Sequence, residues 1–373
     1  MLMGIGPEKH GSFEDFAIQI CREMTIRGHI PHLAFPTPLP DWYKENIQNA
    51  EGRLAPDKLI TTPWAPGSLW QYLKTERIDV VHLHLVNTLV AWLWNQMTEL
   101  PLVMNLHVAK EYGSGNCLDL FASLRARLIY RAAKLIAISD FMRDYALHLG
   151  FGLQPDQVIR IYNGVDTDRF RPVQSRAKIR QKIGWKPDAV MLVTVSHLRK
   201  EKGVDLILKA FAKVASDQPI IQLAVVGDGP ELRALKALAD NLDIAERLHW
   251  LGRRNDAEMI LPAADVFVLT PACDEAFGYV FAEAQSCGLP VITCRSGGIP
   301  EIICNGKTGM ILDKNDVNGL ASAIARIASD VNLRTEMAQH ARANVLAHFD
   351  IRDQVKTIVD LYEKELKGKG PIE

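Results

Sequence analysis

The stretch DVFVLTPACDEAFGYVFAEAQSCGLPVITCRSGGIPE, residues 265–301, decides the fold class. Its two apolar runs, DVFVLT (265–270) and PVITC (290–294), do not alternate with polar residues, which predicts parallel strands covered on both faces. Between them, Glu275 and Glu283 bracket a glycine loop in a segment that otherwise looks suited to burial. A carboxylate in such surroundings costs free energy unless a partner binds to it. We therefore expect a ligand site in this segment.

Similar apolar runs recur along the chain, with helical segments between them. They stand at residues 79–86, 102–108, 134–139, 158–163, 190–196, 221–227 and 247–252. Apolar residues at three- and four-residue spacing, typical of amphipathic helices, mark the segments 118–134, 204–217, 230–242 and 318–330. This alternation predicts an α/β protein with parallel sheets, and it occurs twice.

A break in the pattern divides the chain. The 373 residues exceed one ordinary domain, and NGVDTDRFRPV (163–173) supplies loop residues between the two halves. We predict two doubly wound domains, 1–168 and 169–351. Ligands bind beyond the carboxyl ends of open parallel sheets, so two such domains facing each other would enclose a cleft. The first strand, MLMGIGP (1–7), is short, so the first half looks incomplete at its start.

Composition narrows the class of partner. Forty-three basic and 44 acidic residues leave a net charge of −1, which gives no reason to expect nucleic acid. The N-terminus lacks the continuous apolar core of a secretory signal, and the longest apolar passage, 80–94, is interrupted by polar residues and too short for a bilayer. We therefore expect a cytoplasmic protein. None of the six cysteines forms a C-x-x-C pair, which favours buried thiols over zinc or disulfides.

Three loops of the second half follow predicted strands. They are SHLRKEKGVD (196–205), GDGPEL (227–232) and SGGIPE (296–301). Glycines between a strand and a helix let backbone N–H groups approach a phosphate, and the helix N-terminus adds partial positive charge. Lys202 would add a full charge. The loops together predict a phosphate or sugar site at one edge of the second sheet.

Two other segments imitate phosphate motifs. NGKTG (305–309) contains GKT, but a Walker loop needs glycine where Glu301 stands, so we interpret the segment as a turn. DTD (166–168) imitates the carboxylate pair of a metal–diphosphate site, yet it lies in the interdomain turn and does not end an apolar strand. We expect no metal there.

This ordered set of motifs resembles the retaining glycosyltransferases of the GT-B fold, specifically the family 4 (group 1) enzymes that use nucleotide-diphospho-sugars. The E-x7-E spacing of Glu275 and Glu283 carries the resemblance, which runs from about residue 11 to 350. The other matching segments are Phe277-Gly278, GLPVITCRSGGIPEII, GKTGMIL, GDGPEL, HLRKEKG, NGVDTDRF and RGH (27–29). The resemblance implies two Rossmann-like doubly wound domains facing across a cleft. It also implies that the C-terminal helix, about 352–373, packs back on the first domain.

The resemblance places a donor site in the second domain. Glu283 would accept hydrogen bonds from the ribose diol, while Glu275 would face the transferred sugar. Lys202 would neutralise the diphosphate, which makes a divalent metal unnecessary. The other residues implied in donor binding are Phe277, Gly278, Tyr279, Gly227, Arg253, Gly11 and Ser12. The alternative for either glutamate is a favourable charge at a helix N-terminus.

One position departs from the family pattern. The family usually has arginine five residues before the lysine of the first loop, where this chain has His197. We count His197 among the donor-binding residues. Arg199 would supply the missing charge only if the loop bends differently, so it is a second candidate.

In the first half, the resemblance places His107 near the sugar and the acceptor, with a catalytic role, and Asn163 beside the acceptor. His82 and His84 lie two residues apart and so point to the same face of their strand. We interpret both as packing or cleft-lining groups.

Basic residues recur on the predicted helix 118–134. They are Arg125, Arg127, Arg131 and Lys134. Some family members use such a helix to lie on membranes that carry lipid acceptors. Acidic residues elsewhere balance these four charges, which favours a solvated face, with a weak peripheral membrane contact as the alternative.

The resemblance implies a retaining, metal-independent enzyme without a cofactor. It would move a sugar from a nucleotide-diphospho-sugar, UDP-sugar by default, to a hydroxyl of a glycan, a lipid-linked sugar or a small molecule. No carboxylate is well placed by sequence as a nucleophile, so in the family mechanism the departing phosphate helps to deprotonate the acceptor on the same face. Two rivals stay open: a nucleotide-sugar epimerase of this fold and a non-catalytic sugar-nucleotide binding protein. The sequence does not indicate an oligomeric state.

Overall fold

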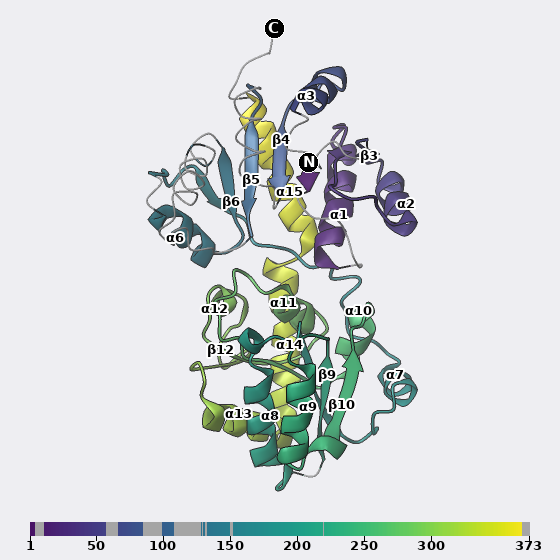
Figure 1. Cartoon of the computed structure of the whole chain (residues 1–373), viewed down its shortest axis with the longest axis vertical. Coiled ribbons are helices and arrows are strands. Elements are labelled where there is room, and N and C mark those ends of the chain that lie inside the picture. Colours follow the sequence, from purple (N-terminus) through teal and green to yellow (C-terminus); the bar gives the residue numbers. More distant parts are fainter. Residues whose placement is uncertain are drawn as a thin grey trace. The chain divides into compact units, whose positions relative to one another are not determined.

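The chain divides into two compact units in the computed structural model (Figure 1). The first unit comprises Met1–Gly164 with Ile351–Glu373, and the second comprises Val165–Asp350. The structure describes residues 1–3, 11–56, 66–84, 99–107, 128, 130, 133–149, 152–218 and 220–367. Three of the four basic positions singled out above, Arg125, Arg127 and Arg131, lie outside these residues.

The first unit is built on a parallel sheet with the strand order β1-β4-β5-β6-β7. These strands are β1 (Leu2–Met3), β4 (Val81–His84), β5 (Leu102–Leu106), β6 (Lys134–Ala137) and β7 (Val158–Arg160). The helices are α1 (Ser12–Ile26), α2 (Asp41–Asn49), α3 (Pro66–Thr75), α6 (Asp140–His148) and α15 (Ile351–Lys367). A separate pair is formed by β2 (His32–Leu33) and β3 (Arg53–Leu54).

The first sheet has a topological switch point beside β1. On one side of β1, the backbone of Ala34 bonds to Met1 and Met3 at 3.0 and 2.9 Å. On the other side, β1 pairs with β4. The chain therefore continues in both directions from β1, and doubly wound sheets bind ligands at the carboxyl ends of the strands beside such a switch point.

The C-terminal helix α15 belongs to the first unit. Its buried face, which includes Val355 and Ile358, packs with Phe16 and Ile20 of α1 and with Val103 of β5. The helix ends at Lys367, and the last six residues of the predicted segment 352–373 lie outside the described residues. Apolar burial thus joins a segment from the end of the chain to the N-terminal half.

The RGH segment (27–29) adds polar contacts between α1 and α15. The guanidinium of Arg27 donates to the carboxylate of Asp360 at 2.5 Å, and Nε2 of His29 lies 3.1 Å from the carboxylate of Glu363. This segment, quoted above for the resemblance, therefore has a packing role within the first unit.

The observed boundary between the units falls at Gly164, before the predicted position at residue 168. The reason lies in hydrogen bonds within the second unit. The N–H of Val165 donates to the carbonyl of Phe349 at 2.9 Å, and the hydroxyl of Thr167 donates to the carboxylate of Asp350 at 2.6 Å. Residues 165–168 are therefore part of the second unit.

The second unit contains a parallel sheet with the strand order β10-β9-β8-β11-β12-β13. Its strands are β8 (Val190–Val195), β9 (Ile221–Val226), β10 (Leu248–Gly252), β11 (Val266–Leu269), β12 (Val291–Cys294) and β13 (Gly309–Leu312). Its α-helices are α7 (Arg176–Lys182), α8 (Val204–Ala215), α9 (Leu232–Asn241), α10 (Ala257–Ile260), α11 (Tyr279–Ser286), α12 (Ile299–Ile302), α13 (Val317–Ser329) and α14 (Val331–His348). Short 3₁₀ turns occupy Lys200–Lys202, Ala245–Arg247 and Leu261–Ala263.

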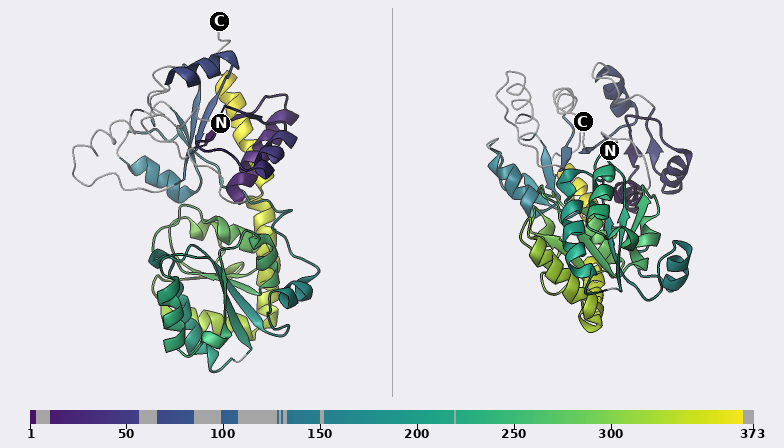
Figure 2. Two further views of the ribbon diagram at one scale, coloured as in Figure 1. Left: turned by 45° about the vertical axis from the view of Figure 1, so that its right-hand side comes forward. Right: turned by 60° about the horizontal axis from the view of Figure 1, so that its bottom comes forward.

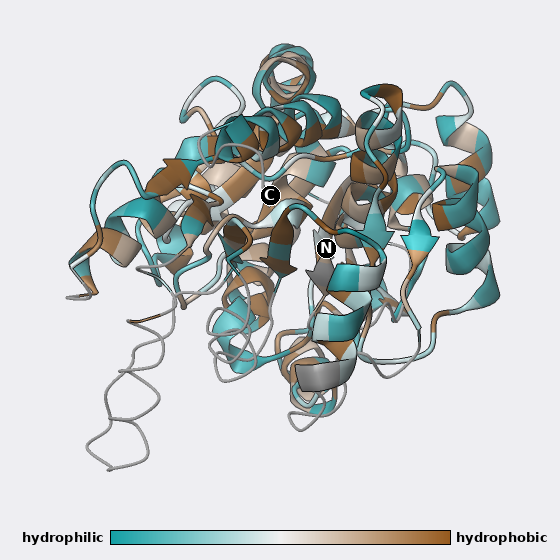
Figure 3. Cartoon of the chain, turned by 90° about the horizontal axis from the view of Figure 1, so that it is seen from above, coloured by the Kyte–Doolittle hydropathy of each residue, from teal (hydrophilic) through white to brown (hydrophobic). Residues whose placement is uncertain are grey.

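The inner strands of the second sheet are buried on both faces, as the unbroken apolar runs predict, whereas the edge strands β10 and β13 are partly exposed. Every residue of β9, β11 and β12 is buried, and helices lie on both sides of the sheet (Figure 2). Along the helices, hydrophilic and hydrophobic positions alternate with each turn (Figure 3). The fold class is confirmed: each unit is a Rossmann-like, doubly wound α/β domain. In the second, the switch point lies between β8 and β11.

Candidate functional site

An ion pair stands at the switch point of the second unit. Lys202, from the loop after β8, places its ammonium 2.5 Å from the carboxylate of Glu275, from the loop after β11. Gly203 makes this approach possible, because its φ is +67° and a Cβ there would lie 2.1 Å from the carbonyl oxygen of Thr270. Both charged side chains stay partly exposed, at 26% and 19%, so a ligand can reach them.

The turn after β12 holds the backbone of Glu275. The N–H of Gly298 donates to the Glu275 carbonyl at 2.8 Å. Gly297 has a φ of +50°, and a Cβ on it would lie 2.2 Å from the same carbonyl oxygen. The glycines of SGGIPE therefore help to hold the backbone of Glu275 in place. Their location after a strand did not indicate this role.

The segment after Glu275 turns into helix α11 at Gly278. This glycine adopts a φ of +91°, and a Cβ there would meet the ring of Phe281 at 2.7 Å. Tyr279 begins the helix, and Glu283 follows one turn later with a partly buried side chain. Phe277 is buried, with its ring centroid 5.8 Å from that of Phe349. The first N–H groups of α11 have no carbonyl partner within the helix, so they can bind an anion.

The loops after β8 and β9 are joined through their backbones. The N–H of Leu198 donates to the carbonyl of Asp228 at 2.9 Å. A Cβ on Gly227 would lie 1.8 Å from the carbonyl oxygen of Ser196, and one on Gly229 would lie 2.7 Å from Nδ1 of His197. The glycines of GDGPEL thus leave room for the first loop, and His197 rests against this loop with an exposed side chain.

In the first unit, a second cluster of polar groups lies at the carboxyl edge of the sheet. His107 follows β5, and its Nε2 lies 3.1 Å from Nδ1 of His84 at the end of β4. Burial lowers the pKa of His107 to about 4. Phe13, next to Gly11 and Ser12 at the start of α1, contacts both imidazole rings edge-on. Gly11, Ser12 and His107 therefore lie in one region of the first unit, and their contact with a ligand stays a prediction.

Comparison with known proteins assigns the family. Residues 14–169 match the model described as Glycosyltransferase Family 4, and residues 175–344 match that of Glycosyl transferases group 1. The chain belongs to the group 1 glycosyltransferases of family 4. Their fold is also that of a known structure from Anabaena, Alr3699/HepE in complex with UDP and glucose, which is 22% identical with a TM-score of 0.78 and covers 97% of this chain and 98% of that chain.

Two curated relatives span most of this glycosyltransferase. N-acetyl-alpha-D-glucosaminyl L-malate synthase of Bacillus anthracis is 29% identical and covers 79% of this chain and 78% of the relative. D-inositol 3-phosphate glycosyltransferase of Corynebacterium jeikeium is 28% identical and covers 80% of this chain and 75% of the relative. Both are similar to this chain over residues of both units.

The two arginine candidates of this glycosyltransferase lie at the surface of the second unit. The guanidinium of Arg199 is 58% exposed and lies 3.8 Å from the carboxylate of Glu201. Arg253 directly follows β10 and is exposed. The partner of Arg199 is thus its neighbour in the loop, which leaves Lys202 as the cation paired with Glu275.

Asn163 has a packing contact in the first unit. Its side chain is buried, and its amide oxygen accepts a hydrogen bond from Gln354 of α15 at 3.2 Å. The oxygen of the same Gln354 amide accepts the N–H of Gly164 at 2.8 Å. These bonds assign Asn163 to the junction with α15, and its proposed contact with an acceptor has no support from its burial.

His82 and His84 are buried and have different hydrogen-bond partners. Nε2 of His82 lies 2.7 Å from Oδ1 of Asn105, and Nδ1 contacts the hydroxyl of Tyr362 in α15. His84 instead contacts His107. Sequence reasoning missed that the two histidines have different partners. The parallel pairing of β4 with β5 would have indicated this once the register was known.

The segments that imitate phosphate motifs are turns. One carboxylate oxygen of Asp166 accepts the N–H groups of Asp168 and Arg169, both at 3.0 Å. In NGKTG, the hydroxyl of Thr308 accepts the N–H of Cys304 at 2.9 Å, just before β13. Within the described ranges, no cluster of three histidine, cysteine or acidic side chains is arranged to hold a metal ion. Among these residues, no helix has the length and apolar character needed to cross a bilayer.

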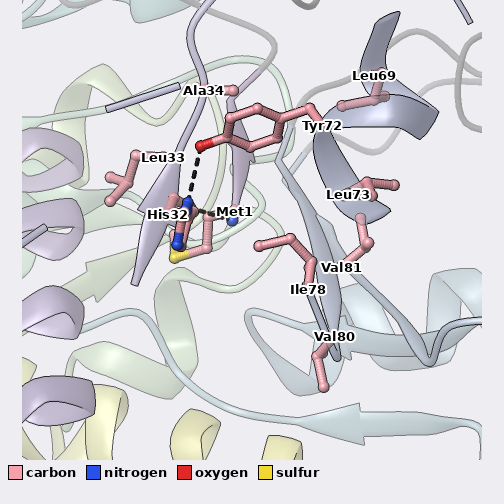
Figure 4. A pocket seen from close by; sticks show the side chains of 10 residues that line it. All are labelled: Met1, His32, Leu33, Ala34, Leu69, Tyr72, Leu73, Ile78, Val80 and Val81. Carbon is pink, nitrogen blue, oxygen red and sulfur yellow. Dashed lines mark hydrogen bonds between the residues drawn. The ribbon is translucent and has the colours of Figure 1, made fainter. Parts of the chain in front are cut away.

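Figure 4 shows a small pocket of the first unit. It is lined by Met1, His32, Leu33, Ala34, Leu69, Tyr72, Leu73, Ile78, Val80 and Val81. The Tyr72 hydroxyl lies 2.8 Å from Nδ1 of His32 at its rim. Its sheet residues stand at the amino ends of β1 and β4, whereas ligands of doubly wound sheets bind at the carboxyl ends. We assign this pocket no role in the reaction.

Proposed function

We propose that this glycosyltransferase moves a sugar from UDP-sugar to a hydroxyl acceptor with retention at the anomeric carbon and without a metal. The ion pair between Lys202 and Glu275 at the switch point between β8 and β11 carries the proposal. A cation beside a carboxylate, both partly exposed, suits a ligand with a negative diphosphate next to a neutral sugar rich in hydroxyl donors. UDP is chosen because the similar Anabaena structure is a complex with UDP and glucose.

Each of the residues at this site would have a distinct role in the reaction. The ammonium of Lys202 would bind the diphosphate and stabilise the charge of the departing nucleotide. Glu275, released from Lys202, would accept hydrogen bonds from the sugar. Glu283, one turn into α11, would accept two hydrogen bonds from the ribose diol, each worth about 1.5 to 3 kcal/mol. The N-terminus of α11, at Gly278 and Tyr279, would add partial positive charge near the phosphate.

We assign retention to a displacement in which the acceptor attacks on the face that the leaving group departs from, as the family resemblance implies. Glu275 accepts a hydrogen bond from Lys202 and would accept others from the sugar hydroxyls once the donor is bound, so we give it no role as a nucleophile. We therefore assign deprotonation of the acceptor to the departing phosphate, on the same face of the sugar. In the first unit, His107 would contact the sugar and the acceptor, and His84 would hold its imidazole. Both relatives' names include a hydroxyl compound, L-malate or D-inositol 3-phosphate, which supports a hydroxyl acceptor.

Two measurements test the proposal. A thermal-shift series with nucleoside mono- and diphosphates should show the largest rise in Tm with UDP. Mass spectrometry of reactions with UDP-sugars and an acceptor panel that includes L-malate and inositol phosphate should show a glycosylated product only when donor and acceptor are both present. A sugar altered without any acceptor would indicate an epimerase, and the absence of stabilisation by every nucleoside diphosphate would refute the donor assignment.

The role of Glu275 is tested by the substitution Glu275→Ala. We expect transfer to fall by at least about 100-fold, because a transition-state contact is lost, while the rise in Tm with UDP persists. A matched control is Glu336→Ala, which changes an exposed carboxylate on α14 of the same unit. If the parent binds UDP but neither parent nor variant transfers a sugar to any acceptor, the non-catalytic binding protein is the better description.

A further inference from the structure

The side chain of Asp274 ties together the ends of three neighbouring strands. It lies in the loop after β11, and its carboxylate accepts the ammonium of Lys314, just past β13, at 2.7 Å. The same oxygen accepts the N–H of Gly297 at 3.2 Å and lies 3.3 Å from the hydroxyl oxygen of Ser296, and both residues stand just past β12. One carboxylate oxygen is therefore shared by groups from two other loops.

The next residue in the chain is Glu275, whose backbone is fixed by the same turn. Gly298 donates to its carbonyl at 2.8 Å, and Gly297 packs so closely against it that any side chain would collide. The hydroxyl of Ser296 also donates to the carbonyl of Cys273 at 2.6 Å, on the other side of Asp274. Backbone bonds thus hold both neighbours of Asp274, while its side chain holds the turn that makes those bonds.

The exposure of this ion pair argues against a role in overall stability. The side chains of Asp274 and Lys314 are 52% and 34% exposed, and exposed ion pairs contribute little to the free energy of unfolding. The Lys314 ammonium holds the pKa of Asp274 below its ordinary value, so the carboxylate is charged at neutral pH. What the pair does provide is a fixed position for the carboxylate of Asp274, and that carboxylate accepts the N–H of Gly297 in the turn after β12.

We propose that Asp274 and Lys314 form a positioning clamp for Glu275, which sets the carboxylate of Glu275 for the transferred sugar without touching the substrate. This inference rests on the proposed role of Glu275. A displacement of a reacting group by about 1 Å can cost about 100-fold in rate, so a clamp of little thermodynamic weight can have a large kinetic effect. Neither residue belongs to the motifs that carry the family resemblance.

The test compares kcat, KM and UDP binding in Asp274→Ala, Lys314→Met and the double variant. We expect each single variant to lose about 10-fold in kcat, through displacement of Glu275. The double variant should lose no more than Asp274→Ala alone, because Lys314 acts only through the carboxylate of Asp274. Asp274→Asn keeps an oxygen that accepts from Gly297, and Lys314→Arg keeps the charge, so each should recover most of the lost kcat.

The matched control is the pair Lys213→Met with Asn318→Ala, which removes an exposed hydrogen bond of 2.9 Å between α8 and α13. Both sets should keep Tm and the thermal shift with UDP close to those of the parent. The clamp is refuted if Asp274→Ala keeps the parent kcat, or if kcat falls only together with Tm and UDP binding, as for a merely structural contact. Failure of the proposed function is distinguishable, since the parent itself would then show no transfer.

Discussion

Burial decides the protonation of the histidines in the first unit. His82 and His84 are fully buried on β4. Burial lowers the pKa of His82 to about 3, opposed by its hydrogen bond to Asn105, and it lowers the pKa of His84 in the same direction, helped by the neighbouring His82. Both imidazoles are therefore neutral at pH 7. A neutral ring has one donor and one acceptor nitrogen, and Nδ1 of His84 makes the contact that can orient His107.

These shifts predict that stability falls as the pH is lowered. An unfolded histidine has a pKa of about 6.5 and takes up a proton below that value, whereas the buried rings stay neutral until about pH 3 in the case of His82. Between these values the unfolded state binds more protons, so stability is lost as the pH falls. From pH 7.5 to 5.5 we expect about 1.4 kcal/mol of lost stability for each buried histidine. Urea denaturation at the two pH values measures it.

Two substitutions separate this effect from general titration. His82→Gln should reduce the difference in unfolding free energy between the two pH values. His148→Gln, at an exposed position on α6, should leave that difference unchanged. Equal stability of the parent at both pH values would show that the histidines are not held neutral by burial.

Two glycines of the second unit can test whether the turn after β12 positions the loop of Glu275. Gly297 and Gly306 both have positive φ, at +50° and +79°. A Cβ on Gly297 would lie 2.2 Å from the carbonyl oxygen of Glu275, whereas one on Gly306 would meet nothing within 4 Å. Alanine at either position carries similar backbone strain, of about 1 to 2 kcal/mol. Only at Gly297 must the loop of Glu275 also move.

We therefore expect Gly297→Ala to lose at least about 100-fold in kcat/KM, since Glu275 is displaced. Gly306→Ala should lose a similar amount of Tm from backbone strain but keep its activity. Steady-state kinetics alongside thermal unfolding gives both quantities for both variants. Equal activity of the two variants would mean that the turn after β12 does not position Glu275.

The limits of sequence reasoning show at this same group of loops. The apolar runs predict the buried strands, and the change from loop to helix at Gly278 is visible because glycine precedes a helical pattern. The contact between Asp274 and Lys314 could not be predicted, because it joins residues 40 positions apart whose distance depends on strand order and register. The same holds for His84 and His107, which meet only through the pairing of β4 with β5. Patterns along the chain indicate burial, whereas side-chain partners across strands need the register.

The boundary between the units also depends on contacts between residues that lie far apart in the sequence. Composition places the break in 163–173, but the assignment of residues 165–168 depends on their bonds to residues near 350. Directly after that point, α15 returns to the first unit. The first unit therefore cannot complete its core until the last helix has been synthesised, since α15 supplies part of the apolar cluster that contains Phe16 and Ile20.

This arrangement predicts that a change in α15 destabilises the N-terminal half. Ile358 is fully buried against α1, so Ile358→Ala should cost about 2 to 5 kcal/mol of stability through lost burial and the cavity left behind. Hydrogen exchange read by mass spectrometry should show the loss of amide protection in the described parts of residues 1–164 and in α15, with Val165–Asp350 little changed. Lys364→Ala, at an exposed position of the same helix, is the control and should leave protection as in the parent. A cavity destabilises the core that surrounds it. Loss of protection mainly within Val165–Asp350 would therefore contradict the assignment of α15 to the core of the first unit.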